Sequence, residues 1–218
     1  MVCTCASWLD GQPHINKAGL RRYNQMAEKA KRSVFGASVS SRLVERYLFN
    51  FRVAPDIVAS RIPVDWLKPR VVNGWGVVSF CILKLEHVTL KPLPSLLGFN
   101  TTSCAYRCSV IDTSGERPEP SVYIPGRSTD LAIVSRLGPA VFSGAMPVIR
   151  TGIAHTPDSV DITASYLDGR NMFSAKVRPE VPEKLDSQLF GSFDELVDFI
   201  KGGVSSYTPS TRATVTRK

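Results

Sequence analysis

The sequence predicts a β-rich α+β domain, folded as a closed antiparallel β-barrel or as a double sheet, with a few short helices. The main observation is the period-two alternation of apolar and polar residues from residue 42 onward, which is typical of strands with one buried face. The second is that many such segments follow one another at short spacing, while few stretches have helical features.

The first 41 residues differ from the rest of the chain. Asn16 is a suitable cap, and apolar residues recur at helical spacing, so we expect a basic amphipathic helix at residues 17–32. Small residues then form a linker, which divides the chain into an N-terminal segment, 1–41, and a β-rich domain, 42–218. The helix is either an anionic-surface anchor or transit segment, or a helix packed against the domain. Its narrow apolar stripe favours the packed helix.

The β-rich domain begins with a strand at residues 42–53, whose alternate positions are apolar. A short helix follows at 57–61, opened by a Pro-Asp pair and ended by a proline. Asn73-Gly74 is a tight-turn signal, which predicts a hairpin between 70–72 and a long strand at 75–88.

The second half of the domain contains two predicted helices among further strands. Ser128 or Thr129 caps a helix at 130–136, and Ser192 caps one that begins at Phe193 and ends before Gly202-Gly203. The predicted strands are 101–112, 121–124, 145–153, 160–166, 171–177 and 204–215.

Composition limits the class of protein. The chain has 218 residues, 43% of them hydrophobic, which is enough for a sizeable core. No apolar run approaches the roughly 18 residues of a membrane-spanning helix. Five cysteines leave one thiol unpaired, and no signal peptide is visible, so we expect a cytoplasmic protein.

The net charge of +8 comes from the two ends of the chain. Residues 17–32 carry a net charge of +5 and residues 201–218 carry +4, whereas residues 33–200 hold 17 basic and 17 acidic side chains. A neutral body argues against specific nucleic-acid binding. One hypothesis is therefore a scaffold whose basic ends dock on an acidic partner or surface.

The common catalytic and cofactor motifs are absent. The sequence has no phosphate loop, Rossmann glycine pattern, nucleophile elbow or HExxH pair, and we expect no cofactor. Cys3 and Cys5 are too few for a structural zinc site, so we expect no metal. Cys104 and Cys108 share one strand face, too far apart for a disulfide, and are interpreted as core residues.

Four stretches resemble the acetoacetate-decarboxylase-like superfamily, and in particular an uncharacterised bacterial branch that lacks the Schiff-base lysines. Residues 47–56 with Ile62-Pro63 are similar to its opening strand, short helix and terminating proline. Residues 128–137 are similar to the segment that leads into the active-site turn, and Met146-Pro147 follows at the expected interval. Residues 199–207 are similar to the closing helix and strand. The likeness spans about residues 42–217.

The resemblance implies a cone-shaped, barrel-like core around an apolar, ligand-sized cavity, often in an oligomer, so a homo-oligomer is one expected state. The decarboxylase itself uses a lysine pair to form a Schiff base with a β-keto acid. Here Ser143 and Gly144 stand at the lysine positions, and no lysine lies between Lys91 and Lys176. Schiff-base decarboxylation is therefore not expected.

Other polar positions implied by the resemblance are also changed. The acidic residue expected near Ser79 is missing, and Val44 stands where a pocket arginine is expected. Only Arg136 has a clear counterpart in the polar site. Together with Arg107 it would supply positive charge for a carboxylate or enolate.

The main functional hypothesis is binding of a small apolar acid or ketone in the barrel cavity. The candidate ligand-binding residues are Arg136, Arg107, Tyr123, Ser143 and Lys176. The alternative enzyme hypothesis is a lyase or hydratase of oxo acids that uses acid/base groups such as Glu86, His87 or Tyr123.

Overall fold

The computed structural model describes residues 3–4, 39–90, 92–142, 144–180, 183–203, 205–209 and 215–217. The predicted helix at 17–32 lies outside these residues, as does Ser143. The elements are, in order, β1 (Cys3–Thr4), β2 (Val39–Val53), α2 (Pro55–Ala59), β3 (Leu67–Pro69), β4 (Val71–Val72), β5 (Trp75–Leu90), the 3₁₀ helix η1 (Ser95–Leu97), β6 (Phe99–Asp112), β7 (Glu119–Thr129), α3 (Ala132–Phe142), β8 (Ile149–His155), β9 (Val160–Tyr166), β10 (Asn171–Val177), α4 (Phe193–Gly202), β11 (Ser205–Pro209) and β12 (Val215–Arg217).

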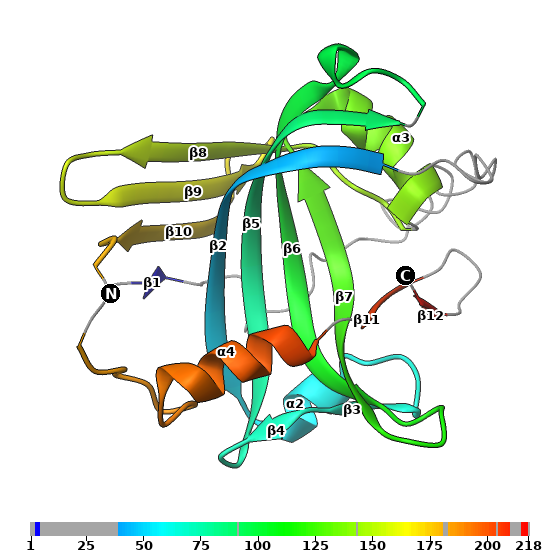
Figure 1. The fold of residues 1–218 in the computed structure, drawn as a ribbon, viewed down its shortest axis with the longest axis vertical. Coiled ribbons are helices and arrows are strands. Elements are labelled where there is room, and N and C mark those ends of the chain that lie inside the picture. The colour runs from blue at the N-terminus through cyan, green and yellow to red at the C-terminus, as the bar shows by residue number, and fades with distance from the viewer. Residues whose placement is uncertain are drawn as a thin grey trace.

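The strands form two sheets (Figure 1). The large sheet has the order β12-β11-β7-β6-β5-β2, with β3 beside β6 and β4 beside β5. The small sheet has the order β1-β10-β9-β8, and its strands cross those of the large sheet at a steep angle in Figure 1. The β-rich, two-sheet prediction is confirmed. Neither sheet closes on itself within the described residues, so closure into a barrel is not confirmed.

The two faces of the large sheet have different chemistry, because side chains alternate along each strand. Phe49 of β2 and Phe80 of β5 lie on what we call the core face, against the small sheet. The Phe173 ring of β10 lies 4.6 Å from that of Phe49 and 4.4 Å from that of Phe80, measured between centroids. Aromatic side chains therefore fill the space between the sheets.

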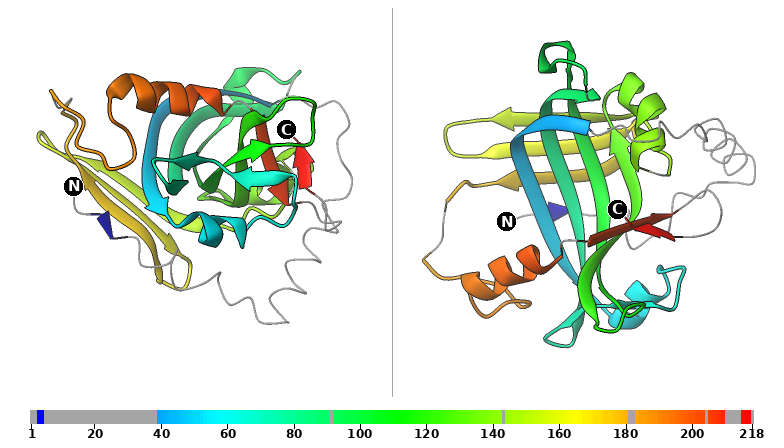
Figure 2. Two further views of the ribbon diagram at one scale, coloured as in Figure 1. Left: turned by 90° about the horizontal axis from the view of Figure 1, so that it is seen from below. Right: turned by 45° about the vertical axis from the view of Figure 1, so that its right-hand side comes forward.

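The other face of the large sheet, which we call the site face, carries Asn50 and Ser79 and is partly covered by α4. The Ser192 hydroxyl caps this helix by accepting from the Glu195 amide at 3.2 Å. Phe199 on the helix packs with Val77 of β5 and with Phe190. Figure 2 shows α4 and the small sheet on different sides of the long strands.

Several predicted elements are confirmed. The β9–β10 hairpin has its predicted bounds, and Asn73-Gly74 turns the chain between β4 and β5 with φ values of 48° and 82°. Cys104 and Cys108 are free, buried core residues, and burial raises the pKa of each thiol to about 12. Such thiols are protonated and unreactive at neutral pH.

Other elements differ from the prediction. The predicted strand at 121–124 is too short, because β7 continues through Pro125 to Thr129. A bulge between the pairs Tyr106–Gly126 and Cys108–Tyr123 accommodates the proline, which has no amide hydrogen for the ladder. No helix of the described residues is long and apolar enough to cross a membrane.

Replacing Phe173 tests the contact between the sheets. Because this ring is fully buried against Phe49 and Phe80, Phe173→Ala is expected to lower the free energy of unfolding by about 3–5 kcal/mol. Urea denaturation measures the loss. The matched variant Phe193→Ala, at a partly exposed ring on α4, should change it by less than about 1 kcal/mol. Equal losses in the two variants would contradict this account of the core.

Candidate functional site

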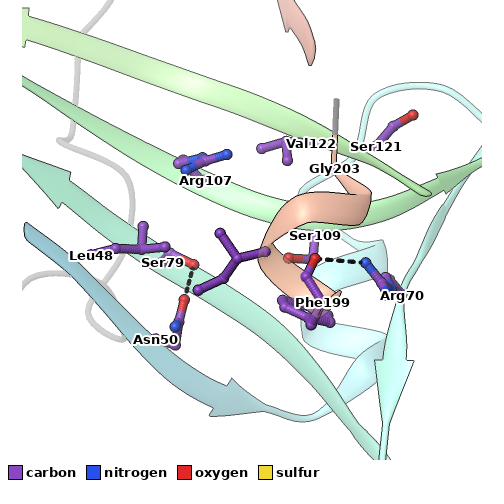
Figure 3. Close-up of a pocket in the computed structure, with 11 residues that line it drawn as sticks. Leu48, Asn50, Arg70, Ser79, Arg107, Ser109, Ser121, Val122, Phe199 and Gly203 are labelled. Carbon is purple, nitrogen blue, oxygen red and sulfur yellow. Dashed lines mark hydrogen bonds between the residues drawn. The ribbon is translucent and has the colours of Figure 1, made fainter. Parts of the chain in front are cut away.

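A polar pocket lies on the site face, between α4 and the large sheet (Figure 3). Its volume is about 20 Å³, which is room for about one water molecule. It is smaller and more polar than the apolar, ligand-sized cavity that the resemblance implies. Its lining residues are Leu48, Asn50, Arg70, Ser79, Arg107, Ser109, Ser121, Val122, Phe199, Ile200 and Gly203.

Strand register places three polar side chains of the pocket in one row. Asn50 of β2 is paired with Ser79 of β5, which is paired with Arg107 of β6. The Ser79 hydroxyl donates to Asn50 Oδ1 at 2.7 Å. The row thus brings an amide, a hydroxyl and a guanidinium to the same level of the sheet, where one small polar ligand could contact all three.

The bulge in β7 lies beside this row. Arg107 is the residue of β6 skipped by the shift in register, since its neighbours pair with Gly126 and Tyr123. Bulges bend a strand locally and redirect side chains, and they are frequent beside binding sites. Arg107 therefore has no pairing partner in β7, unlike its two neighbours in β6.

Two arginines on the site face are partly removed from water. Burial lowers the pKa of Arg107, and the positive charge of Arg46 lowers it further. Burial also lowers the pKa of Arg127, with a smaller contribution from Arg107. Arg107 interacts with the Cys81 thiol, and within the described chain it forms no ion pair with a carboxylate. Positive charge therefore accumulates here, which favours an anionic ligand.

Arg70 closes the other end of the pocket. Its Nη1 donates to the Phe199 carbonyl oxygen at 3.1 Å, and its guanidinium lies 4.2 Å from the centroid of the Phe199 ring. The bond satisfies one of the last carbonyl groups of α4, where a cation also interacts favourably with the helix dipole. Arg70 thus fixes the helix against the pocket.

The five predicted site residues are not gathered in one place. Arg107 lines the pocket, whereas Tyr123 is buried on the core face with Cys108. Arg136 is exposed on α3. Lys176 is exposed on β10, with its Nζ 3.5 Å from Asp161 Oδ1. Ser143 lies outside the described residues.

The sequence reasoning missed Asn50, Arg70 and Arg127 as site residues and used Ser79 only to mark a missing acid. The alternation of side chains along a strand alone predicts that Asn50 lies on the same face as Leu48, and Ser79 on the same face as Cys81. The position of Arg127 was not accessible in this way, because the bulge shifts the parity of β7. The approach of Arg70 depends on where α4 ends.

A separate polar cluster links the two sheets. Glu45 Oε1 accepts from Lys84 Nζ at 2.9 Å, while Glu45 Oε2 accepts from the Tyr47 hydroxyl at 2.7 Å and lies 3.1 Å from His155 Nε2. The bond from Lys84 is the main cause of the lowered pKa of Glu45, and the same bond raises the pKa of Lys84. Burial and the bond to Glu45 raise the pKa of Tyr47 to about 12. Lys84 is thus a protonated ion-pair partner and not a free amine.

Comparison with solved structures identifies the fold as acetoacetate-decarboxylase-like. Acetoacetate decarboxylase from Legionella pneumophila is similar with a TM-score of 0.54 and 13% sequence identity, over 81% of this chain and 62% of that one. The enduracididine biosynthesis enzyme MppR, complexed with pyruvate, is similar with a TM-score of 0.52 and 14% identity, over 75% of this chain and 61% of that one. The chain spans about three fifths of these structures. No protein-family model and no curated protein matches the sequence.

The Glu45 cluster predicts a pH dependence of stability. Since the pKa of Glu45 is lowered on folding, its contribution is present above its ordinary value of 4.5 and is lost as the pH falls through the lower value of the folded state. We expect Glu45→Gln to lower the free energy of unfolding by about 0.5–1 kcal/mol at neutral pH, after allowance for solvent screening. The difference from the wild type should shrink below pH 4.5.

Denaturant unfolding at a series of pH values measures this difference. Asp158→Asn is the control, since Asp158 is exposed in the turn between β8 and β9 and is not part of the Glu45 cluster, and it should differ little from the wild type across the series. A Glu45→Gln difference that stays constant down to about pH 3 would contradict the assignment, because the carboxylate would then be protonated without loss of stability.

Proposed function

We propose that the chain binds the carboxylate of a small oxo acid on the site face, with Arg107 as the main contact and without Schiff-base chemistry. The observation that carries the proposal is a partly buried guanidinium that lines a polar pocket and has no carboxylate partner within the described chain. Bonds between a guanidinium and a carboxylate are charge-assisted and often bidentate, and they strengthen when water is excluded.

The neighbouring groups support a carboxylate as the ligand. Arg127 brings a second guanidinium near the pocket, since the charge of Arg107 contributes to the lowering of its pKa. Asn50 Nδ2 can donate to the second oxygen of a carboxylate or to a neighbouring keto group, while the Ser79 hydroxyl donates to Asn50 Oδ1 and so holds the amide in place. The pocket volume of about 20 Å³ holds about one water molecule, so a carboxylate would enter only as the side chains around Arg107 move apart.

A larger open depression on the far side of Arg70 is a weaker candidate. It has a volume of about 450 Å³ and is lined by Arg70, Phe190 and Phe199 together with Glu195 and Asp198. Two carboxylates beside one arginine disfavour an organic acid, because the like charges repel it. The smaller pocket is therefore preferred.

The positions of the described lysines support ligand binding without formation of a Schiff base. The described residues that line the pocket include no lysine. Lys84 is paired with Glu45 on the core face, and Lys176 is exposed on the small sheet. A Schiff base needs an unprotonated amine within reach of the ketone, as in the decarboxylase mechanism.

The lyase or hydratase alternative has less support. Tyr123, its proposed acid/base residue, packs on the core face. His87 is exposed and has a positive φ of 53°, at the shift in register of β5 that lies eight residues along the strand from Ser79. General acid/base groups must come within hydrogen-bond reach of the ligand, which these positions do not favour.

Isothermal titration with acetoacetate, pyruvate and acetone tests the proposal. We expect the two acids to bind and acetone, which lacks a carboxylate, not to bind. Arg107→Gln should weaken acid binding by at least about 10-fold, the usual effect of removing a hydrogen bond to a charged group. The matched variant Arg136→Gln, at an exposed arginine of α3, should leave the affinity unchanged. Failure of both acids to bind, or unchanged affinity in Arg107→Gln, would contradict the proposal.

Reduction with borohydride in the presence of acetoacetate tests the chemistry separately. We expect no covalent adduct by intact-mass measurement, since no amine lines the described pocket. A mass increase located on any lysine would refute binding without a Schiff base, even if Arg107 proved essential.

A further inference from the structure

A second arginine lies next to Arg107 on the site face. Ala105, two residues before Arg107 on β6, pairs with Arg127 of β7. Residues two apart on a strand point to the same face, so the two arginines are diagonal neighbours whose side chains begin about 7–8 Å apart. Arg107 itself lies at the end of the pocket away from Arg70 (Figure 3). The charged surface therefore continues past this end of the pocket.

Arg46 is a third arginine on the same face. It pairs with Leu83 of β5, which pairs with Ser103 of β6, two residues before Ala105. Its positive charge contributes to the lowered pKa of Arg107, so the two guanidinium groups approach each other across β5. Arginines from three strands thus surround one area of the sheet.

The area between the three arginines has a floor of short or apolar side chains. Leu48 of β2 pairs with Cys81 of β5, and Cys81 pairs with Ala105 of β6, so the three residues form one row. The Arg107 guanidinium interacts with the Cys81 thiol, which brings it over this row. Leu48 and Ala105 are both partly exposed, so the floor is not completely covered.

Carboxylates of the described chain leave much of this charge unbalanced. Arg46 and Arg107 form no ion pair with any of them. Glu45, although next to Arg46 in sequence, points to the opposite face and is bonded within the cluster between the sheets. Asp130 accepts from the Thr101 hydroxyl at 2.8 Å, six residues before Arg107 on β6. The positive charge therefore exceeds what one carboxylate of a ligand would balance.

We propose that the ligand is an oxo dicarboxylic acid, whose first carboxylate binds Arg107 and whose second binds Arg127, with Arg46 adding positive charge beside it. This inference rests on the proposed function, because Arg107 holds the first carboxylate in both. The separation of about 7–8 Å between the two side-chain origins suits two carboxylates joined by a short carbon chain. A guanidinium presents five N–H donors in a planar fork, so each arginine can bind a carboxylate through two bonds.

Isothermal titration of the full chain with 2-oxoglutarate and 2-oxopentanoate tests the inference. The two acids share the oxo carboxylate and a five-carbon chain, and they differ only in the second carboxylate, which a methyl group replaces in 2-oxopentanoate. We expect 2-oxoglutarate to bind at least about 10-fold more tightly, the usual effect of hydrogen bonds between charged groups.

Substitutions assign this preference to the arginines. Arg127→Gln should lower the affinity for 2-oxoglutarate by about 10-fold or more and that for 2-oxopentanoate by less than about 3-fold. Arg46→Gln should reduce the preference by about 3-fold, and because Arg46 is exposed this variant keeps the fold. The matched control is Arg52→Gln, at an exposed arginine of β2 whose guanidinium lies 4.8 Å from the centroid of the Trp75 ring. It should leave the preference unchanged.

Three results would overturn the inference. The first is equal affinity of the wild type for the two acids, and the second is a preference that Arg52→Gln reduces as much as Arg127→Gln or Arg46→Gln does. The third is tighter binding of inorganic phosphate than of 2-oxoglutarate, because the arginines would then form a site for an inorganic oxyanion. Circular dichroism checks the fold of Arg127→Gln, and Arg46→Gln decides the matter if that variant does not fold.

The proposed function has a separate readout. Binding of pyruvate and acetoacetate, and its loss in Arg107→Gln, does not depend on the second carboxylate. Equal affinity for 2-oxoglutarate and 2-oxopentanoate would therefore refute the dicarboxylate and leave the Arg107 site standing, whereas failure of every acid to bind would refute both.

Discussion

The alternation of side chains along β5 and β6 is the constraint on which the rest of the structure depends. Phe80 points to the small sheet and Ser79 to α4, and each neighbouring strand repeats the division. A shift of one residue in the register of β5 would place a serine among aromatic rings and a phenylalanine in the polar pocket. The contact of Phe80 with Phe173 therefore stabilises the fold and also fixes which side chains reach the site face.

Partial burial of two guanidinium groups on the site face costs free energy, which other interactions in the fold must offset. Arg107 and Arg127 are both partly buried and both have lowered pKa values, chiefly because burial disfavours the charged form. A guanidinium nevertheless stays protonated at neutral pH, so the charge remains and its repulsion is not removed by proton loss. The large aromatic core on the opposite face supplies the stability against which this local repulsion is maintained.

Much of the fold was accessible from sequence, because period-two alternation and turn residues are local signals. The β4–β5 turn at Asn73-Gly74 and the β9–β10 hairpin are confirmed on that basis. The site was less accessible, because Arg107 meets Ser79 only through strand pairing, and the bulge beside Pro125 cannot be read from alternation. Cys104 could be assigned correctly from the sequence, because a cysteine on the apolar face of a strand is expected in the core.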